Sequence, residues 1–142
     1  MPNPETKPPK VLIAENNAAI AMTLRELLSL IGLEVVGVAA SVNDALCLAQ
    51  NTKPDLAIFD ARLEGRRDGI EGAALLREIV DIPVVFLTAQ GDKEMNARVE
   101  DLNPASHLRK PLGSQEIVAA VEIALGRSID QLDRQAPGGL FA

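Results

Sequence analysis

The sequence is poor in aromatic residues and has a single cysteine. Its 142 residues include three Phe, no Trp and no Tyr, and Cys47 is the only cysteine. One cysteine excludes an internal disulfide and is typical of a reducing compartment such as the cytoplasm. Because Cys47 falls within an apolar helical pattern, we expect it to serve packing rather than chemistry. With so few aromatics, the core must consist of Ala, Val, Ile and Leu, as in close-packed α/β sheets.

The chain also lacks a basic surface and a long apolar run. Fourteen Lys and Arg are outnumbered by twenty Asp and Glu, which gives a net charge of -6. This balance argues against nucleic acid as the main partner, because phosphate backbones are bound by basic surfaces. No apolar run approaches the roughly 18 residues of a membrane helix. Residues 1–10 contain four prolines and no apolar segment, unlike a signal peptide. We therefore expect a cytoplasmic protein without membrane contact.

What the sequence does contain is a regular alternation of two patterns. Short runs rich in Val, Ile and Leu predict buried strands, and the segments between them carry apolar residues at helical spacing. The expected strands are 11–14, 35–38, 56–59, 84–87 and 105–108, and the expected helices are 18–31, 41–50, 70–80, 93–102 and 114–125. Alternation with short links predicts an α/β fold, a doubly wound parallel sheet of five strands with helices on both faces.

The helical segments carry further signals at their ends and on their faces. Ser114 is expected to cap the last helix, and Ser41 or Asn43 the second. The segment 93–102 is the most polar of the five. In the third helix, the residues expected to face inward are Ile70, Ala73, Ala74, Leu76 and Ile79.

The length fits one compact domain. We expect this domain to span residues 10–127, after a short disordered lead at 1–9 and before a tail at 128–142. The tail contains the sequence Pro137-Gly138-Gly139. We find no internal repeat and too few remaining residues for a second domain.

Polar residues stand where the apolar runs stop. Asp60 follows the third run, Glu15 and Asn16 follow the first, Thr88 follows the fourth, and Lys110 comes after the fifth. Ligands of open parallel sheets bind outside the carboxyl ends of the strands, so we expect these residues to converge on one cleft. They combine a carboxylate nucleophile, oxygen ligands for a cation, a hydroxyl and an ammonium. Such a set suits phosphoryl transfer.

Each of these residues also has a purely structural interpretation. Asp60 and Thr88 are of types that cap loops, Lys110 is of a type common on surfaces, and Glu15 with Asn16 is placed to cap the helix near Ala18.

The motifs and their order resemble the receiver domain of two-component response regulators, the chemotaxis-type, flavodoxin-like fold. The resemblance covers roughly residues 10–125. It rests on Glu15, Pro54-Asp55-Leu56 leading to Asp60, Asp68-Gly69, Ile82-Pro83-Val84, Thr88-Ala89 and Lys110-Pro111. It implies a stand-alone signalling protein, not an enzyme, that works in a two-component system or phosphorelay.

The resemblance also implies roles for individual residues. Asp60 would accept a phosphoryl group from the phosphohistidine of a histidine kinase or histidine phosphotransfer protein. Thr88 would hydrogen-bond that group, and Lys110 would pair with Asp60, with a cis bond before Pro111. His107, the only histidine, stands where the family often has an aromatic switch residue. A lone histidine is a poor candidate for a zinc site.

The implied cofactor is Mg²⁺, and here the sequence departs from the family. The expected ligands are Glu15, Asn16, Asp60 and the main-chain carbonyl of Arg62. The family usually has two acids where this chain has Glu15 and Asn16. Mg²⁺ prefers anionic oxygen ligands, so the neutral amide of Asn16 should weaken its binding.

A second departure is the loop 61–69, which is about one residue longer than the common pattern and lacks its proline. In the family, the positions of Arg62 and Gln90 tune how fast the phosphoryl group is lost. The pair Arg66-Arg67 is either solvated surface or a docking contact for an acidic kinase. The downstream target would bind the face formed by 93–102, the last strand and the last helix, and the chain would be a monomer or weak dimer.

Two other interpretations compete with a working receiver. A pseudo-receiver, an interaction module that does not use phosphorylation, is favoured by Asn16 and disfavoured by Asp60, Thr88 and Lys110. A small enzyme or cofactor binder is disfavoured, because a dinucleotide site should show G-x-G-x-x-G where this chain has residues 15–18 without glycine. The scarcity of aromatics also disfavours a flavin site.

Overall fold

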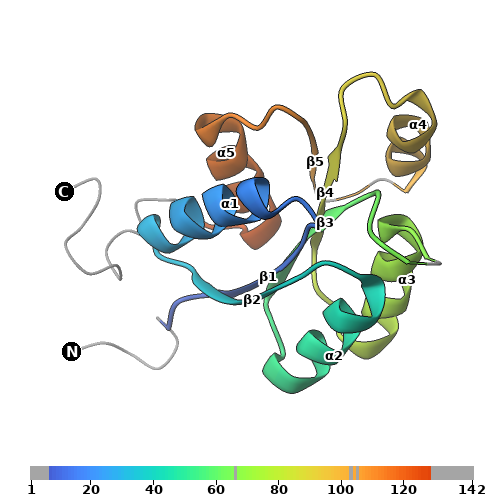
Figure 1. The fold of residues 1–142 in the computed structure, drawn as a ribbon. Helices are drawn as coiled ribbons and strands as arrows, with labels where there is room; N and C mark the ends of the chain where they lie inside the picture. The colour runs from blue at the N-terminus through green and yellow to red at the C-terminus, as the bar shows by residue number, and fades with distance from the viewer. Residues whose placement is uncertain (1–6, 66, 103, 105, 129–142) are drawn as a thin grey trace.

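The computed structural model describes residues 7–65, 67–102, 104 and 106–128, and within them five strands alternate with five helices (Figure 1). The strands are β1 (Lys10–Ala14), β2 (Glu34–Ala39), β3 (Leu56–Asp60), β4 (Val84–Thr88) and β5 (Ser106–Arg109), and the helices are α1 (Ala18–Leu30), α2 (Val42–Thr52), α3 (Gly69–Ile79), α4 (Lys93–Asp101) and α5 (Ser114–Leu125). The expected order of elements is confirmed, with bounds that differ by at most two residues.

All five strands run parallel in one sheet, in the order β2-β1-β3-β4-β5. The predicted doubly wound α/β fold is therefore confirmed. The strand order reverses between β1 and β3, which lie side by side with Ala14 opposite Phe59. Their carboxyl ends form the crevice in which such sheets bind ligands.

Two apolar cores lie on the two faces of the sheet. Val11 and Ile13 of β1 join the core beneath α1 and α5, whereas Leu12 and Ala14 join the core beneath α2, α3 and α4. This separation follows from the period of two along a strand. Figure 1 shows α1 and α5 on one side of the sheet and the other three helices opposite. Both faces are thus covered, as the continuous apolar runs of β3 and β4 require.

Three expectations about the helices are wrong. In α3, Ala74 and Ile79 are exposed. This helix begins at Gly69 under a capping box made by Asp68 and Glu71, and its buried face is set by Ala73 and Leu76, which lie three residues apart. Ala74 stands about 100° around the helix from Ala73, so it points away from the sheet.

Cys47 is exposed rather than packed. The buried residues of α2 are Val42, Ala45 and Ala49, at helical spacing, and Cys47 stands two residues from each of the last two, on the opposite side. Ser41 is the N-cap of this helix, and its hydroxyl accepts a hydrogen bond from the backbone N–H of Asp44.

The N-cap of α5 is Gly113, not Ser114, and it makes no side-chain cap hydrogen bond. A Cβ at Gly113 would lie 1.9 Å from Oε2 of Glu116, so the side chain of Glu116 folds back over the glycine. The carboxylate is the far end of a flexible side chain, so this contact does not by itself require glycine at the cap position.

The expected lead at 1–9 and tail at 128–142 lie mostly outside the described residues. Within the described ranges, no helix has the length and apolar character that crossing a membrane requires.

Candidate functional site

The carboxyl edge of the sheet gathers the buried polar residues of the described chain. These are Glu15, Asp60 and Thr88, with 2%, 5% and 1% of their surfaces exposed. Asp60 ends β3, Thr88 ends β4, and Glu15 follows β1 directly. Burial of a charged group is costly unless it is paired, so residues kept here need partners.

Lys110 supplies the partner for both acids. Its Nζ lies 2.7 Å from Oδ2 of Asp60 and 2.8 Å from Oε1 of Glu15. Its backbone N–H donates to the carbonyl of Thr88 at 2.8 Å, and the Lys110–Pro111 bond is cis. Burial alone would lower the pKa of Lys110, but the carboxylates of Asp60 and Glu15 outweigh it and raise that pKa. Lys110 therefore stays charged between the two acids.

Glu15 is the acid of this cluster whose negative charge is least well compensated. Burial and the neighbouring Asp60 raise the pKa of Glu15 above its usual value, although Lys110 and the backbone N–H of Asn17 act against the shift. One ammonium thus compensates two carboxylates only in part. The site favours further positive charge, and a divalent cation would supply it.

The oxygen donors at the site fit Mg²⁺, with less charge than usual. The carboxylates of Glu15 and Asp60 are hard oxygen ligands, and Asn16 and the Arg62 carbonyl would add neutral oxygens. Within the described ranges, no group of three or more His, Cys, Asp or Glu is placed to hold a metal ion. Asn16 is exposed.

The capping interpretation of Glu15 and Asn16 is wrong. The N-cap of α1 is Asn17, whose side chain accepts a hydrogen bond from Ile20 N. Glu15 instead accepts the backbone N–H of Asn17 at 3.0 Å. The side chain of Glu15 is thereby held facing Lys110 and not the helix.

The loop after β3 is built closely around Asp60. Oδ1 of Asp60 accepts the backbone N–H of Arg62 at 2.9 Å. A Cβ at Gly69 would lie 1.8 Å from the backbone oxygen of Asp60, so only glycine fits at this position. This contact gives the Asp68-Gly69 motif a physical reason.

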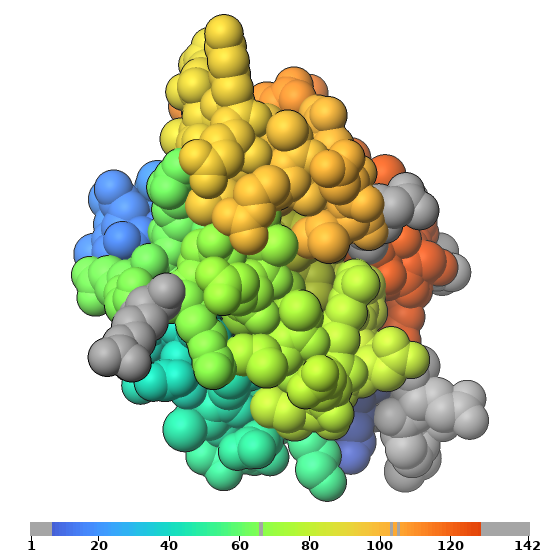
Figure 2. Space-filling view, turned by 90° about the vertical axis from the view of Figure 1, so that its right-hand side faces the viewer, coloured from blue at the N-terminus to red at the C-terminus, as the bar shows by residue number. Residues whose placement is uncertain are grey.

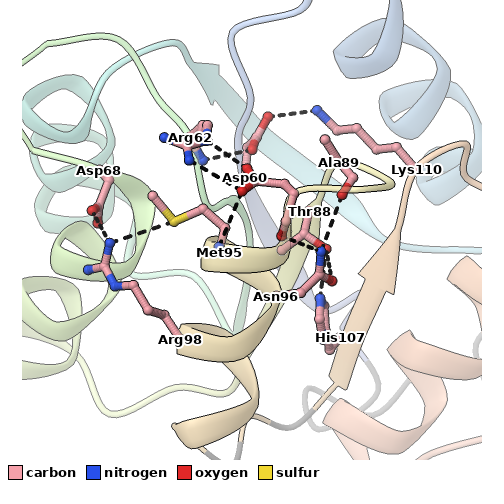
Figure 3. A network of polar contacts seen from close by, with 11 residues as sticks. Asp60, Arg62, Asp68, Thr88, Ala89, Met95, Asn96, Arg98, His107 and Lys110 are labelled. Atoms are coloured by element: carbon pink, nitrogen blue, oxygen red, sulfur yellow. Dashed lines mark hydrogen bonds and ion pairs between the residues drawn. The ribbon is translucent and has the colours of Figure 1, made fainter.

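Thr88 points to α4 and β5 (Figure 3). Its hydroxyl donates to Oδ1 of Asn96 at 2.8 Å and lies 2.7 Å from Nε2 of His107. Thr88 of β4 and His107 of β5 are therefore in direct contact. His107 is half-buried, and burial, followed by the charge of Arg109, lowers its pKa.

Sequence reasoning missed Asn96 and the polar ties of α4. Arg62 donates through Nε to Oδ2 of Asp92 at 2.6 Å, and Asp92 is the N-cap of α4. Arg98 pairs with Asp68 at 2.8 Å, which joins α4 to the start of α3. Figure 2 shows the α4 region, in yellow to orange, directly above green α3 on one face of the molecule.

These ties perturb the acids involved. Arg62 lowers the pKa of Asp92. Burial would raise the pKa of Asp68, but the Glu71 backbone N–H and Arg98 outweigh it, and that pKa is lowered. A sequence signal existed for Asp92, which precedes a polar helical segment as an N-cap should. Gln90 and Arg67 are exposed, and Arg66 lies outside the described residues.

Comparison with known proteins identifies the family. The family model of the response regulator receiver domain matches residues 11–122 of this chain. The transcriptional regulatory protein PdtaR of Mycobacterium tuberculosis is 38% identical over 120 residues, covering 84% of this chain and 58% of PdtaR. The phyllosphere-induced regulator PhyR of Methylorubrum extorquens is 30% identical over 82% of this chain and 43% of its own length.

A solved structure agrees with these relatives. The signal receiver domain of a modulated diguanylate cyclase from Desulfovibrio desulfuricans G20 superposes with a TM-score of 0.77 at 34% identity, over 84% of this chain and 94% of that one. The chain belongs to the response regulator receiver domains, which are signalling modules of two-component systems. It spans about half the length of the curated relatives described above.

Proposed function

Starting from this family membership, we propose that the chain is a working receiver that takes a phosphoryl group onto Asp60 from phosphohistidine. The donor is a histidine kinase or a histidine phosphotransfer protein. The observation that carries the proposal is the position of Asp60, buried at the switch point with Lys110 at 2.7 Å. A carboxylate attacks an anionic phosphoryl group only when charge is neutralised, and this cluster is built to do so.

The transfer exchanges one bond for another. A carboxylate oxygen of Asp60 forms a bond to phosphorus as the phosphorus–nitrogen bond of the donor breaks, and the histidine leaves with the electron pair of that bond. Lys110 stabilises charge on the acceptor and on the phosphoryl oxygens. Glu15, Asp60, Asn16 and the Arg62 carbonyl would hold Mg²⁺, which neutralises phosphoryl charge when bound.

The donor has room to approach beside Lys110. A cavity of about 270 Å³ lies between α1 and the start of α5, and most of its lining is apolar. It includes Ile20 and Leu24 of α1 together with Pro111 and Leu112. This cavity supports docking of an apolar helix face of the donor next to the acceptor.

The output is a change in the surface formed by α4, β5 and α5. Phosphorylation adds about -1.5 to -2 charges at Asp60. Thr88 then turns toward the new oxygens, and His107, which contacts it, changes position. The target of that surface is a protein, in keeping with the acidic balance of the chain.

A second candidate is a pseudo-receiver that does not use phosphorylation. Asn16 favours it, since one metal-binding charge is missing. The variant Asn16→Asp restores that charge and should tighten Mg²⁺ binding if the site uses the metal. An unchanged Mg²⁺ affinity in this variant would favour the pseudo-receiver.

Intact mass after incubation with a small-molecule phosphodonor, with and without Mg²⁺, tests the proposal. We expect one phosphoryl adduct that requires Mg²⁺, disappears in Asp60→Asn and persists in Asp81→Asn, the same substitution at an exposed acid. A folded wild type that forms no adduct with this donor or with a phosphohistidine protein would refute the proposal.

A further inference from the structure

We propose that Asn96 is a positioning residue that holds the Thr88 hydroxyl on α4 in the unphosphorylated protein, so that phosphorylation must break this bond. The inference rests on the proposed function, because it assigns a cause to the movement of Thr88. Asn96 lies in α4, eight residues beyond Thr88, and joins β4, α4 and β5 in one network (Figure 3).

The hydrogen bonds of Asn96 fix the orientation of its amide. Nδ2 donates to the backbone oxygen of Asp92 at 2.6 Å and to that of Ala89 at 3.3 Å. Oδ1 accepts from Nε of Arg109 at 2.8 Å. Exchanging the nitrogen and oxygen would set donor against donor at Arg109 and acceptor against acceptor at the two carbonyls. The atom facing Thr88 is therefore an acceptor.

A count of protons then assigns the rest of the network. The hydroxyl of Thr88 has one hydrogen, and Oδ1 of Asn96 at 2.8 Å takes it. His107 Nε2, at 2.7 Å from the same hydroxyl, must therefore carry its own hydrogen and donate it to Thr88. The network predicts that neutral His107 is the Nε2–H tautomer.

The same count makes the two states of Thr88 exclusive. A phosphoryl group on Asp60 offers only acceptors, so Thr88 can donate its hydrogen either to Asn96 or to the phosphoryl group. When Thr88 turns, Oδ1 of Asn96 keeps its hydrogen bond from Arg109 but loses the one from Thr88 of β4. The Nε2–H of His107 loses the Thr88 hydroxyl as its acceptor. The charge change at Asp60 is thereby converted into a change in how α4 and β5 are joined.

The effect on phosphoryl binding follows from this competition. The Thr88–Asn96 hydrogen bond is partly buried, and a typical intramolecular hydrogen bond shifts an equilibrium about fivefold. If that bond favours the resting position of Thr88, its loss in Asn96→Ala should tighten binding of the phosphoryl mimic beryllofluoride about fivefold. Asn43→Ala, the same change at an exposed position of α2, should leave the affinity unchanged.

The test measures beryllofluoride affinity with Mg²⁺ in wild type, Asn96→Ala, Thr88→Val and the double variant. Support consists of a tighter complex in Asn96→Ala and no further effect of that change in the Thr88→Val background. If wild type binds the probe and Asn96→Ala binds it equally or more weakly, the inference is refuted and the proposed function stands. If folded wild type does not bind the probe, the inference is refuted, and if it also forms no phosphoryl adduct, the proposed function fails with it.

The ring of His107 gives a second readout that needs no phosphoryl mimic. His107 is the only histidine, so its ¹⁵N ring signals are unambiguous. In wild type we expect the neutral Nε2–H tautomer. In Asn96→Ala the freed hydroxyl can donate to Nε2, and the Nδ1–H tautomer should gain population. A wild-type ring in the Nδ1–H form would overturn the assignment without any variant having to fold.

Discussion

Helices α1 and α4 cover the same sheet but are attached to it in different ways. In α1 the buried residues are Ala21, Leu24 and Leu28, which face an apolar core. In α4 only Met95 and Val99 are buried, and polar ties run from Asp92, Asn96, Arg98 and Glu100 to neighbouring elements. A helix held by apolar burial is indifferent to a new charge, whereas one held by polar contacts can respond to it.

The magnitudes support this contrast. Burial of one Leu side chain stabilises by about 1.5–3 kcal/mol. Ion pairs near the surface contribute much less, because solvent screens them, and the Arg62–Asp92 and Arg109–Glu100 pairs are of this kind. Asp60 is linked to α4 through Arg62. Asp60 accepts a hydrogen bond from the backbone N–H of Arg62, and the side chain of Arg62 pairs with Asp92, the N-cap of α4. A charge change at Asp60 therefore acts on the weaker attachment.

The largest expected effect is on the apolar side. Leu24→Ala should lower the free energy of unfolding by about 2–5 kcal/mol, because Leu24 is fully buried and a cavity would remain. Urea denaturation measures this change. Leu30→Ala in the same helix, at a residue that is 57% exposed, is the matched control and should cost far less. If the two substitutions lowered the free energy of unfolding equally, apolar burial would not be what attaches α1 to the sheet.

A smaller effect of opposite sign is expected at the acid cluster. Glu15→Gln should raise the free energy of unfolding at neutral pH by on the order of 1 kcal/mol. It removes a buried negative charge, while Lys110 still forms its ion pair with Asp60. Since the folded-state pKa of Glu15 is raised above 4.5, its ionisation favours the unfolded protein. Wild type should therefore lose stability relative to Glu15→Gln as pH rises from below 4.5 to neutrality.

Thermal unfolding of both proteins across this pH range measures that difference. A gap that is constant with pH would show that Glu15 titrates normally. A gap that widens as pH falls would contradict the assigned direction of its pKa shift.

The smallest global effect is expected at α4. Arg98→Gln breaks the pair with Asp68 and should lower the free energy of unfolding by less than the Leu24→Ala change does, because solvent screens this pair. Amide exchange in α4 should nevertheless accelerate while that of α1 stays unchanged, because α4 opens locally. Arg77→Gln, on α3, is the control. Faster exchange in α1 as well would show that the two helices open together.

The fold and the acid cluster were predictable from the sequence, because strand topology alone brings Glu15, Asp60 and Lys110 together. The position of Cys47 follows from the buried register of α2, which the apolar pattern of the sequence alone does not resolve. The orientation of Thr88 was not predictable. It depends on Asn96, an ordinary polar residue in a polar helix, whose importance appears only when α4 is placed beside β5.

The central claim is that phosphorylation of Asp60 acts on α4 and leaves α1 alone. Amide hydrogen exchange in saturating phosphodonor and Mg²⁺, with occupancy checked by intact mass and Asp60→Asn as the blank, tests it directly. We predict that the amide exchange rates of α4 and β5 change on phosphorylation and that those of α1 do not. A fully phosphorylated protein with unchanged α4, or with equal changes in α1, would contradict the account.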